Sequence, residues 1–271
     1  MLDDVIEQGP PCDIGARLLR PFATRVALRV IGVPPQDEAM IASWSDAVRS
    51  DAGRSEIGVE LQGYLGELLM HKRRSPSNDA LSDLAHNCRR RAPSDESLMI
   101  RAAELLLLGY ETAAARTTYG VLSILAHPRQ QAALARDASL VPTAVEEILR
   151  FAVPGGSWIP RYALADIEYG AASITAGELV VFAIQAANRD ELEFVNPAVF
   201  DIARQPNPHV GFGHGKFFCL GATTTLMIMQ IVTKTLFARL PTLCLTMPVE
   251  SLPLDTGKIT GGLAALPVSW S

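Results

Sequence analysis

A glycine-rich segment surrounds a single cysteine late in this chain of 271 residues: GFGHGKFFCLG, residues 211–221. Glycine loses more conformational freedom on folding than any other residue, so such a cluster indicates backbone that takes φ > 0 or closely approaches another group. Three interpretations compete: a phosphate-binding loop, a tight turn with a structural thiol, and a loop that presents a thiolate to a metal.

The spacing of the residues excludes both kinds of phosphate loop. A P-loop needs GxxxxGK followed by Ser or Thr, but Phe217 follows Lys216 and Val210 stands where the first glycine should be. A dinucleotide fingerprint needs a preceding strand and an acidic residue about twenty positions later. QPNPHV predicts no strand, and TKTLFARLP contains no acid. A buried structural thiol stays open on these residues alone, because free cysteine is among the most buried residue types.

The order F-G-x-G-x-x-x-C-x-G resembles the haem-binding loop of cytochromes P450, in their bacterial form. The matching residues are Phe212, Gly213, Gly215, Cys219 and Gly221. The resemblance implies that Cys219 is the thiolate ligand of the haem iron and that the glycines let the backbone pass under the porphyrin. The N-terminus of the following helix is then expected to stabilise the negative sulfur.

Two helical motifs match the same family in the same order. LGYETA, residues 108–113, is similar to its oxygen-binding signature, which implies that Glu111 and Thr112 are the catalytic acid–alcohol pair that delivers protons. The alternative is that Gly109 serves only helix packing. The second motif is EEILR, in which Glu147 and Arg150 match the family's ExxR structural signature. The alternative is an ordinary surface ion pair three residues apart on a helix.

The resemblance also assigns residues to the haem propionates. Arg161 in IPRYA matches a propionate-binding arginine, a role that suits a guanidinium because it forms charge-assisted bonds with carboxylates. The alternative is a solvated strand arginine. His214 is a second candidate, although it is equally consistent with a turn residue. Two departures stand out: Phe217 replaces the usual histidine, and Val199 replaces an arginine often found in the meander before the loop.

Mostly helices are predicted to position these residues. ATRVALRVIGVPPQDEAMIASWSDAVRS indicates two helices with Gly32 and Pro34 at the break. The longest predicted helix covers about residues 95–126, with Ser94 as its N-cap and Pro128 beyond its end. Short strands with glycine turns are predicted for IPRYALADIEYGAASITAGELVVFAI. A buried helix is predicted for TTTLMIMQIVTKTLFARL. We therefore expect a mainly α fold with a small β-sheet, as one P450-like haem-thiolate domain over residues 1–271.

Composition narrows the function classes. The net charge of −5 does not favour binding to nucleic acids or to anionic membranes. The start of the chain lacks the pattern of a signal peptide, and no run of eighteen apolar residues occurs. The four cysteines, Cys12, Cys88, Cys219 and Cys244, lack CxxC spacing, which argues against a zinc site or a disulfide framework. A cytoplasmic protein is expected.

The resemblance begins near DIGARLLRPFATRV, so the chain is expected to lack the N-terminal part of the family fold. It implies a monooxygenase that inserts one atom of dioxygen into a small organic substrate. Electrons would come from a separate ferredoxin or flavodoxin-like donor. Two alternatives stay open: a non-catalytic scaffold or partner subunit, and a haem protein that catalyses a cyclisation or rearrangement. Self-association, or a partner chain over the distal side, is expected where apolar helix faces are left uncovered.

Overall fold

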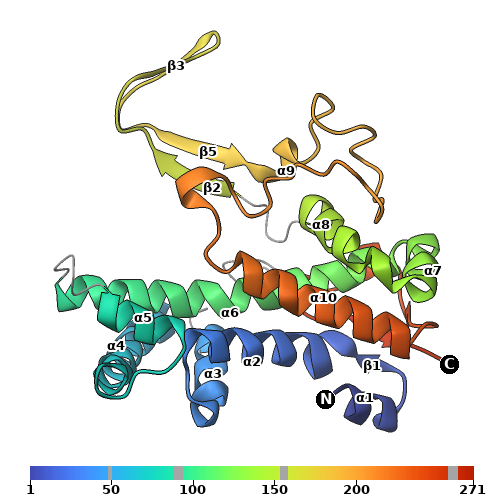
Figure 1. Ribbon diagram of the computed structural model, residues 1–271, viewed down its shortest axis with the longest axis horizontal. Helices are drawn as coiled ribbons and strands as arrows, with labels where there is room; N and C mark the ends of the chain where they lie inside the picture. Colours follow the sequence, from blue (N-terminus) through green and yellow to red (C-terminus); the bar gives the residue numbers. More distant parts are fainter. Residues whose placement is uncertain (48–50, 88–93, 153–157, 256–261) are drawn as a thin grey trace.

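The computed structural model describes residues 1–47, 51–87, 94–152, 158–255 and 262–271 (Figure 1). The helices over these residues are α1 (Leu2–Gln8), α2 (Arg20–Ile31), α3 (Glu38–Ala47), α4 (Asp51–Arg74), α5 (Ala80–Asn87), α6 (Asp95–Leu125), α7 (Pro128–Arg136), α8 (Val141–Phe151), α9 (Ile184–Ala187) and α10 (Ala222–Arg239). No helix in this described part of the chain is long and apolar enough to cross a membrane. The expected mainly α fold is confirmed.

The long helix α6 runs through the middle of the helical layer, with α2 and α10 lying along it (Figure 1). Its 31 residues span about 46 Å at 1.5 Å per residue. Ser94 is the N-cap, since its hydroxyl oxygen accepts a hydrogen bond from the backbone N–H of Ser97. After the helix ends, Pro128 begins α7 as its first residue. Both predicted end signals of this helix are therefore confirmed.

The two halves of α6 lie in different apolar cores. The first half packs with α2, α3, α4 and α5 in a cluster that includes Leu98 and Leu106. The second half packs with α8 and α10 in a cluster that includes Ile124 and Leu236. Between the two cores, small buried residues let the helices approach, among them Ala113 of α6. The centre of α6 is thus packed between α2 and α10, which fixes the position of Thr112, the residue before Ala113.

Gly109 of α6 faces α2 and serves helix packing. A Cβ atom at this position would lie 2.9 Å from Cδ1 of Ile31, which is closer than real Cβ contacts allow. The close approach of α2 therefore explains why a glycine is present at position 109. Glycine within a helix costs roughly 1 kcal/mol relative to alanine, and close packing of α2 offsets that cost.

The strands of the described residues form three separate antiparallel sheets, where the sequence predicts one small sheet. They are β1 (Cys12–Asp13), β7 (Pro267–Ser269) and β6 (Cys244–Leu245) in that order, then the pair β2 (Trp158–Tyr162) and β5 (Leu179–Ala183), and the pair β3 (Ile167–Tyr169) and β4 (Ala172–Ile174). The predicted glycine turns are confirmed, because Gly170 and Gly177 have φ of 60° and 89°. The two pairs extend away from the helices (Figure 1).

The helix α10 is less buried than its apolar sequence predicts. Met227 and Ile231, four residues apart, are exposed on one face. The opposite face, with Ile228 and Leu236, is fully buried. An apolar sequence alone does not show which face of a helix is covered.

Candidate active site

The backbone of the cysteine loop turns back on itself in front of α10. Gly213 and Gly215 have φ of 75° and 62°, a region that other residues rarely adopt. A short 3₁₀ turn covers Gly215–Phe217, and the N–H of Cys219 donates to the carbonyl of Phe212 at 2.8 Å. The Cys219 side chain is exposed and its thiol is free. The predicted loop thus holds one thiol outward from a tightly folded backbone.

Two phenylalanines and a glycine of the loop lie near Cys219. Phe212 packs on the main apolar core, and its ring meets that of Phe218 at a centroid distance of 6.0 Å. Gly221 is the N-cap of α10, so Cys219 lies two residues before the positive end of that helix. A Cβ atom at Gly221 would lie 3.9 Å from Sγ of Cys219, which is ordinary contact. The sulfur therefore lies close to the N-terminal end of α10.

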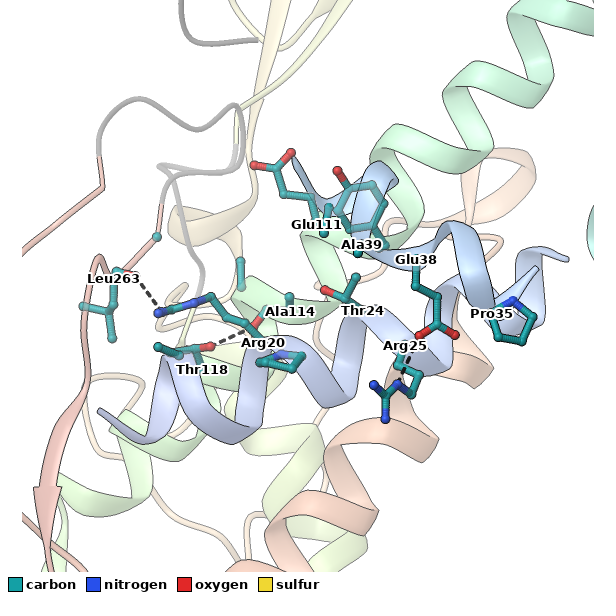
Figure 2. Close-up of a pocket in the computed structure, with 16 residues that line it drawn as sticks. Arg20, Thr24, Arg25, Pro35, Glu38, Ala39, Glu111, Ala114, Thr118 and Leu263 are labelled. Carbon is teal, nitrogen blue, oxygen red and sulfur yellow. Dashed lines mark hydrogen bonds and ion pairs between the residues drawn. The ribbon is translucent and has the colours of Figure 1, made fainter. Parts of the chain in front are cut away.

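Thr112 and Glu111 leave α6 in different directions. The hydroxyl of Thr112 donates to the carbonyl of Leu108 at 2.5 Å. Glu111 lines a cavity of about 500 Å³ bounded by α2, α3 and α6, and Thr112 is not among its lining residues (Figure 2). The predicted acid and alcohol are thus adjacent in sequence but face different surroundings.

The cavity beside Glu111 is lined by both charged and small residues. Arg25 donates to Glu38 at 3.1 Å, and Arg20 donates to the carbonyl of Leu263 at 3.2 Å (Figure 2). Its described lining includes no residue of the cysteine loop. The cavity therefore lies between α2, α3 and α6, apart from the cysteine loop.

Arg161 and His214 lie at the rim of the loop. The Arg161 guanidinium lies over the ring of Phe217, 4.8 Å from its centroid, and donates to the carbonyl of Pro160 at 2.7 Å. Lys216 approaches the same ring at 5.1 Å. His214 is exposed, immediately before the 3₁₀ turn. The phenylalanine that replaces the family histidine thus brings two cations together.

A buried carboxylate holds the meander, residues 188–210, that leads into the loop. Glu147 and Arg150 of α8 are both fully buried and pair through two bonds, of 2.7 and 2.8 Å. Nε of Arg204 also donates to Glu147, at 3.1 Å. Val199 stands where the family often has an arginine, but another arginine serves the meander of this chain. Arg204, five residues later, reaches the same carboxylate, and both arginines also donate to the carbonyl of Val199.

Arg116 is a residue that sequence reasoning missed. It follows Thr112 by one helical turn and donates to the carbonyls of Ala152 and Gly211. Burial lowers the pKa of its guanidinium, while the charge of Cys219 partly opposes that shift. The available signal was a charged residue within the largely uncharged segment ETAAARTTYGVL, on the face of the helix that carries Thr112.

The residues around Cys219 fit the haem that the loop predicts. Iron takes a thiolate ligand, and Cys219 offers a free, exposed thiol. Large apolar side chains are exposed beside it in the loop, namely Phe218 and Leu220, and Leu108 is exposed on α6. A flat apolar macrocycle would remove such surface from water, and Arg161 could bind its carboxylates.

A sequence model of the family "Cytochrome P450" matches residues 56–251. Pentalenolactone synthase of Streptomyces exfoliatus is 38% identical over 277 residues, covering 100% of this chain and 69% of that protein. Nocardicin C N-oxygenase of Nocardia uniformis subsp. tsuyamanensis is 37% identical over 278 residues, again covering 100% of this chain and 69% of the relative.

Solved structures agree with these sequence matches. The putative thioether synthase SgvP superposes with a TM-score of 0.92 at 33% identity, covering 99% of this chain and 70% of that structure. The LnmA cytochrome P450 hydroxylase of Streptomyces atroolivaceus S-140 superposes with a TM-score of 0.90 at 34% identity, covering 99% and 71%. The chain belongs to the cytochrome P450 family.

Proposed function

We propose that this chain is a haem-thiolate monooxygenase in which Cys219 binds the iron. P450-type monooxygenation as the general activity follows from the family. The observation that carries the assignment of Cys219 is its free, exposed thiol on a loop shaped by two glycines of positive φ, just before the N-terminus of α10. Helix N-termini are in general favourable places for negatively charged ligands.

Thr112 and Glu111 are proposed to supply protons. When bound, haem supplies the redox-active iron at which dioxygen is reduced, and the thiolate donates electron density to it. The Thr112 hydroxyl is anchored at the Leu108 carbonyl, which leaves its oxygen lone pairs able to accept a hydrogen bond from water. Glu111 lies one residue away and borders the cavity, and its proposed role is to exchange protons with water in that space.

The remaining site residues are proposed to hold the cofactor. Arg161 binds a propionate, with Phe217 supporting its guanidinium from below, and His214 assists at the same rim. Phe212 anchors the loop on the apolar core. Gly213 and Gly221 have no side chain, so they leave space near the sulfur for the cofactor.

The substrate is proposed to be a small organic molecule and the electron donor a separate ferredoxin or flavodoxin-like protein in the cytoplasm. Relatives carry names such as nocardicin C N-oxygenase and mycinamicin IV hydroxylase/epoxidase, which denote oxidation of organic compounds. The sequence shows no flavin or iron–sulfur motif of its own, which supports an external donor.

The test is the reduced carbon-monoxide difference spectrum of haem-loaded protein. Wild type should give the Soret band of a thiolate-ligated haem, and Cys219→Ser should lose it. Cys244→Ser is the matched control, because Cys244 is also an exposed free cysteine but lies in β6. A thiolate band that persists in Cys219→Ser would refute the assignment.

A further inference from the structure

A single guanidinium connects three segments around the cysteine loop. Nη2 of Arg116 donates to the carbonyl of Gly211, the first residue of the loop, at 3.2 Å. Its Nη1 donates to the carbonyl of Ala152, the C-cap of α8, at 3.4 Å. Because Arg116 belongs to α6, the helix that carries Thr112 is tied directly to the start of the loop that carries Cys219.

The charge of Arg116 lies close to the backbone that holds Cys219. Arg116 donates to the carbonyl of Gly211, and the carbonyl of the adjacent Phe212 accepts a hydrogen bond from the N–H of Cys219 at 2.8 Å. The hydrogen-bond partners of Arg116 in the described part of the chain are two neutral carbonyls. These carbonyls orient the guanidinium without cancelling its charge. The side chain is also partly buried, where solvent screens a charge less than at the surface.

We propose that Arg116 is a positioning residue that fixes the cysteine loop against α6 and raises the reduction potential of the bound haem. This inference rests on the proposed ligation by Cys219. One electron from an external one-electron donor converts ferric to ferrous haem without making or breaking a protein bond, so the site gains one negative charge. A nearby cation attracts that added charge and stabilises the reduced form.

The experiment separates the charge of Arg116 from its fork of donors. Arg116→Gln keeps hydrogen-bonding ability and removes the charge, whereas Arg116→Lys keeps the charge and removes the planar fork. Arg101→Gln is the matched control, since it removes the same charge from an exposed position of the same helix. Midpoint potentials are measured by spectroelectrochemical titration of haem-loaded protein, and hydrogen exchange of residues 211–221 is measured on haem-free protein.

Arg116→Gln should favour the ferric form at least tenfold more than wild type, which is about 59 mV for a one-electron couple. Arg116→Lys should keep most of the potential but lose protection of the loop against exchange. Arg101→Gln should change neither. If Arg116→Gln cannot retain haem while its circular dichroism stays normal, the positioning role is supported. The role of the charge is then judged from the midpoint potential of Arg116→Lys, which should stay close to that of wild type.

Two results would overturn the proposal in distinguishable ways. A wild-type protein without a thiolate Soret band would refute the proposed function itself. A normal thiolate band, with unchanged potential in Arg116→Gln and unchanged loop exchange in both variants, would refute only the role of Arg116.

Discussion

Replacing Glu147 by glutamine keeps the size of the side chain but removes the negative charge that two arginines share. Arg150 and Arg204 both donate to this carboxylate, and the backbone N–H of Asp201 donates to it at 2.9 Å. In Glu147→Gln the two guanidiniums would be left without their counter-charge in a site where both Glu147 and Arg150 have no solvent exposure.

Removing one partner of a buried ion pair costs about 3–5 kcal/mol, because the remaining charge stays desolvated and unpaired. Native proteins are stable by only about 5–15 kcal/mol, so this loss is a large share of the total. At about 2–4 °C per kcal/mol for a chain of this size, the melting temperature should fall by roughly 6–20 °C.

The assays are urea unfolding for the free energy and thermal unfolding for the melting temperature, both followed by circular dichroism. Variants are compared at equal haem occupancy because bound ligand adds stability. Glu146→Gln is the matched control. The carboxylate of Glu146, the residue before Glu147, pairs with His209 but its side chain is 43% exposed. That change should cost no more than about 1 kcal/mol. A loss below about 1 kcal/mol in Glu147→Gln would show that the buried carboxylate does not balance the two arginines.

Three further outcomes are expected. Thr112→Ala should release peroxide and lower the ratio of product to reductant consumed while the iron spectrum stays unchanged; equal coupling would contradict proton delivery by Thr112. Arg161→Ala should speed haem transfer to apomyoglobin at least tenfold, since a charge-assisted bond is worth about 1.5–3 kcal/mol, and an unchanged rate would remove Arg161 from the propionate site. Gly213→Ala should reduce haem retention, because φ is 75° and the new Cβ would lie 3.1 Å from the carbonyl of Phe217; wild-type retention would show that the loop adapts.

Local signals in the sequence predicted much of the fold. The ends of α6 follow from Ser94 and Pro128, and the turns of the β3–β4 pair and before β5 follow from Gly170 and Gly177. The cysteine loop is also local, since its glycines and Cys219 lie within eleven residues. Such features depend on the conformational preferences of neighbouring residues, which a sequence displays directly.

Contacts between distant segments could not be predicted in this way. Arg204 reaches Glu147 across 57 positions, and Arg116 reaches Gly211 across 95. The two-residue strand β1 pairs with β7 near the other end of the chain and has no length over which a pattern could show. Helical periodicity likewise shows that α6 has distinct faces, but it could not show that Gly109 meets α2.

The meander is held by side chains that bind its backbone carbonyls. Arg150 donates to the carbonyls of Asn188, Pro197 and Val199, and Arg204 donates to those of Val195, Asn196 and Val199. Tolerance of an insertion depends on the burial and hydrogen bonding of the backbone that it displaces. Peptide tags or fluorescent labels therefore belong at the exposed turn at Gly170, because one added residue between 195 and 199 would move carbonyls out of register with two guanidiniums at once.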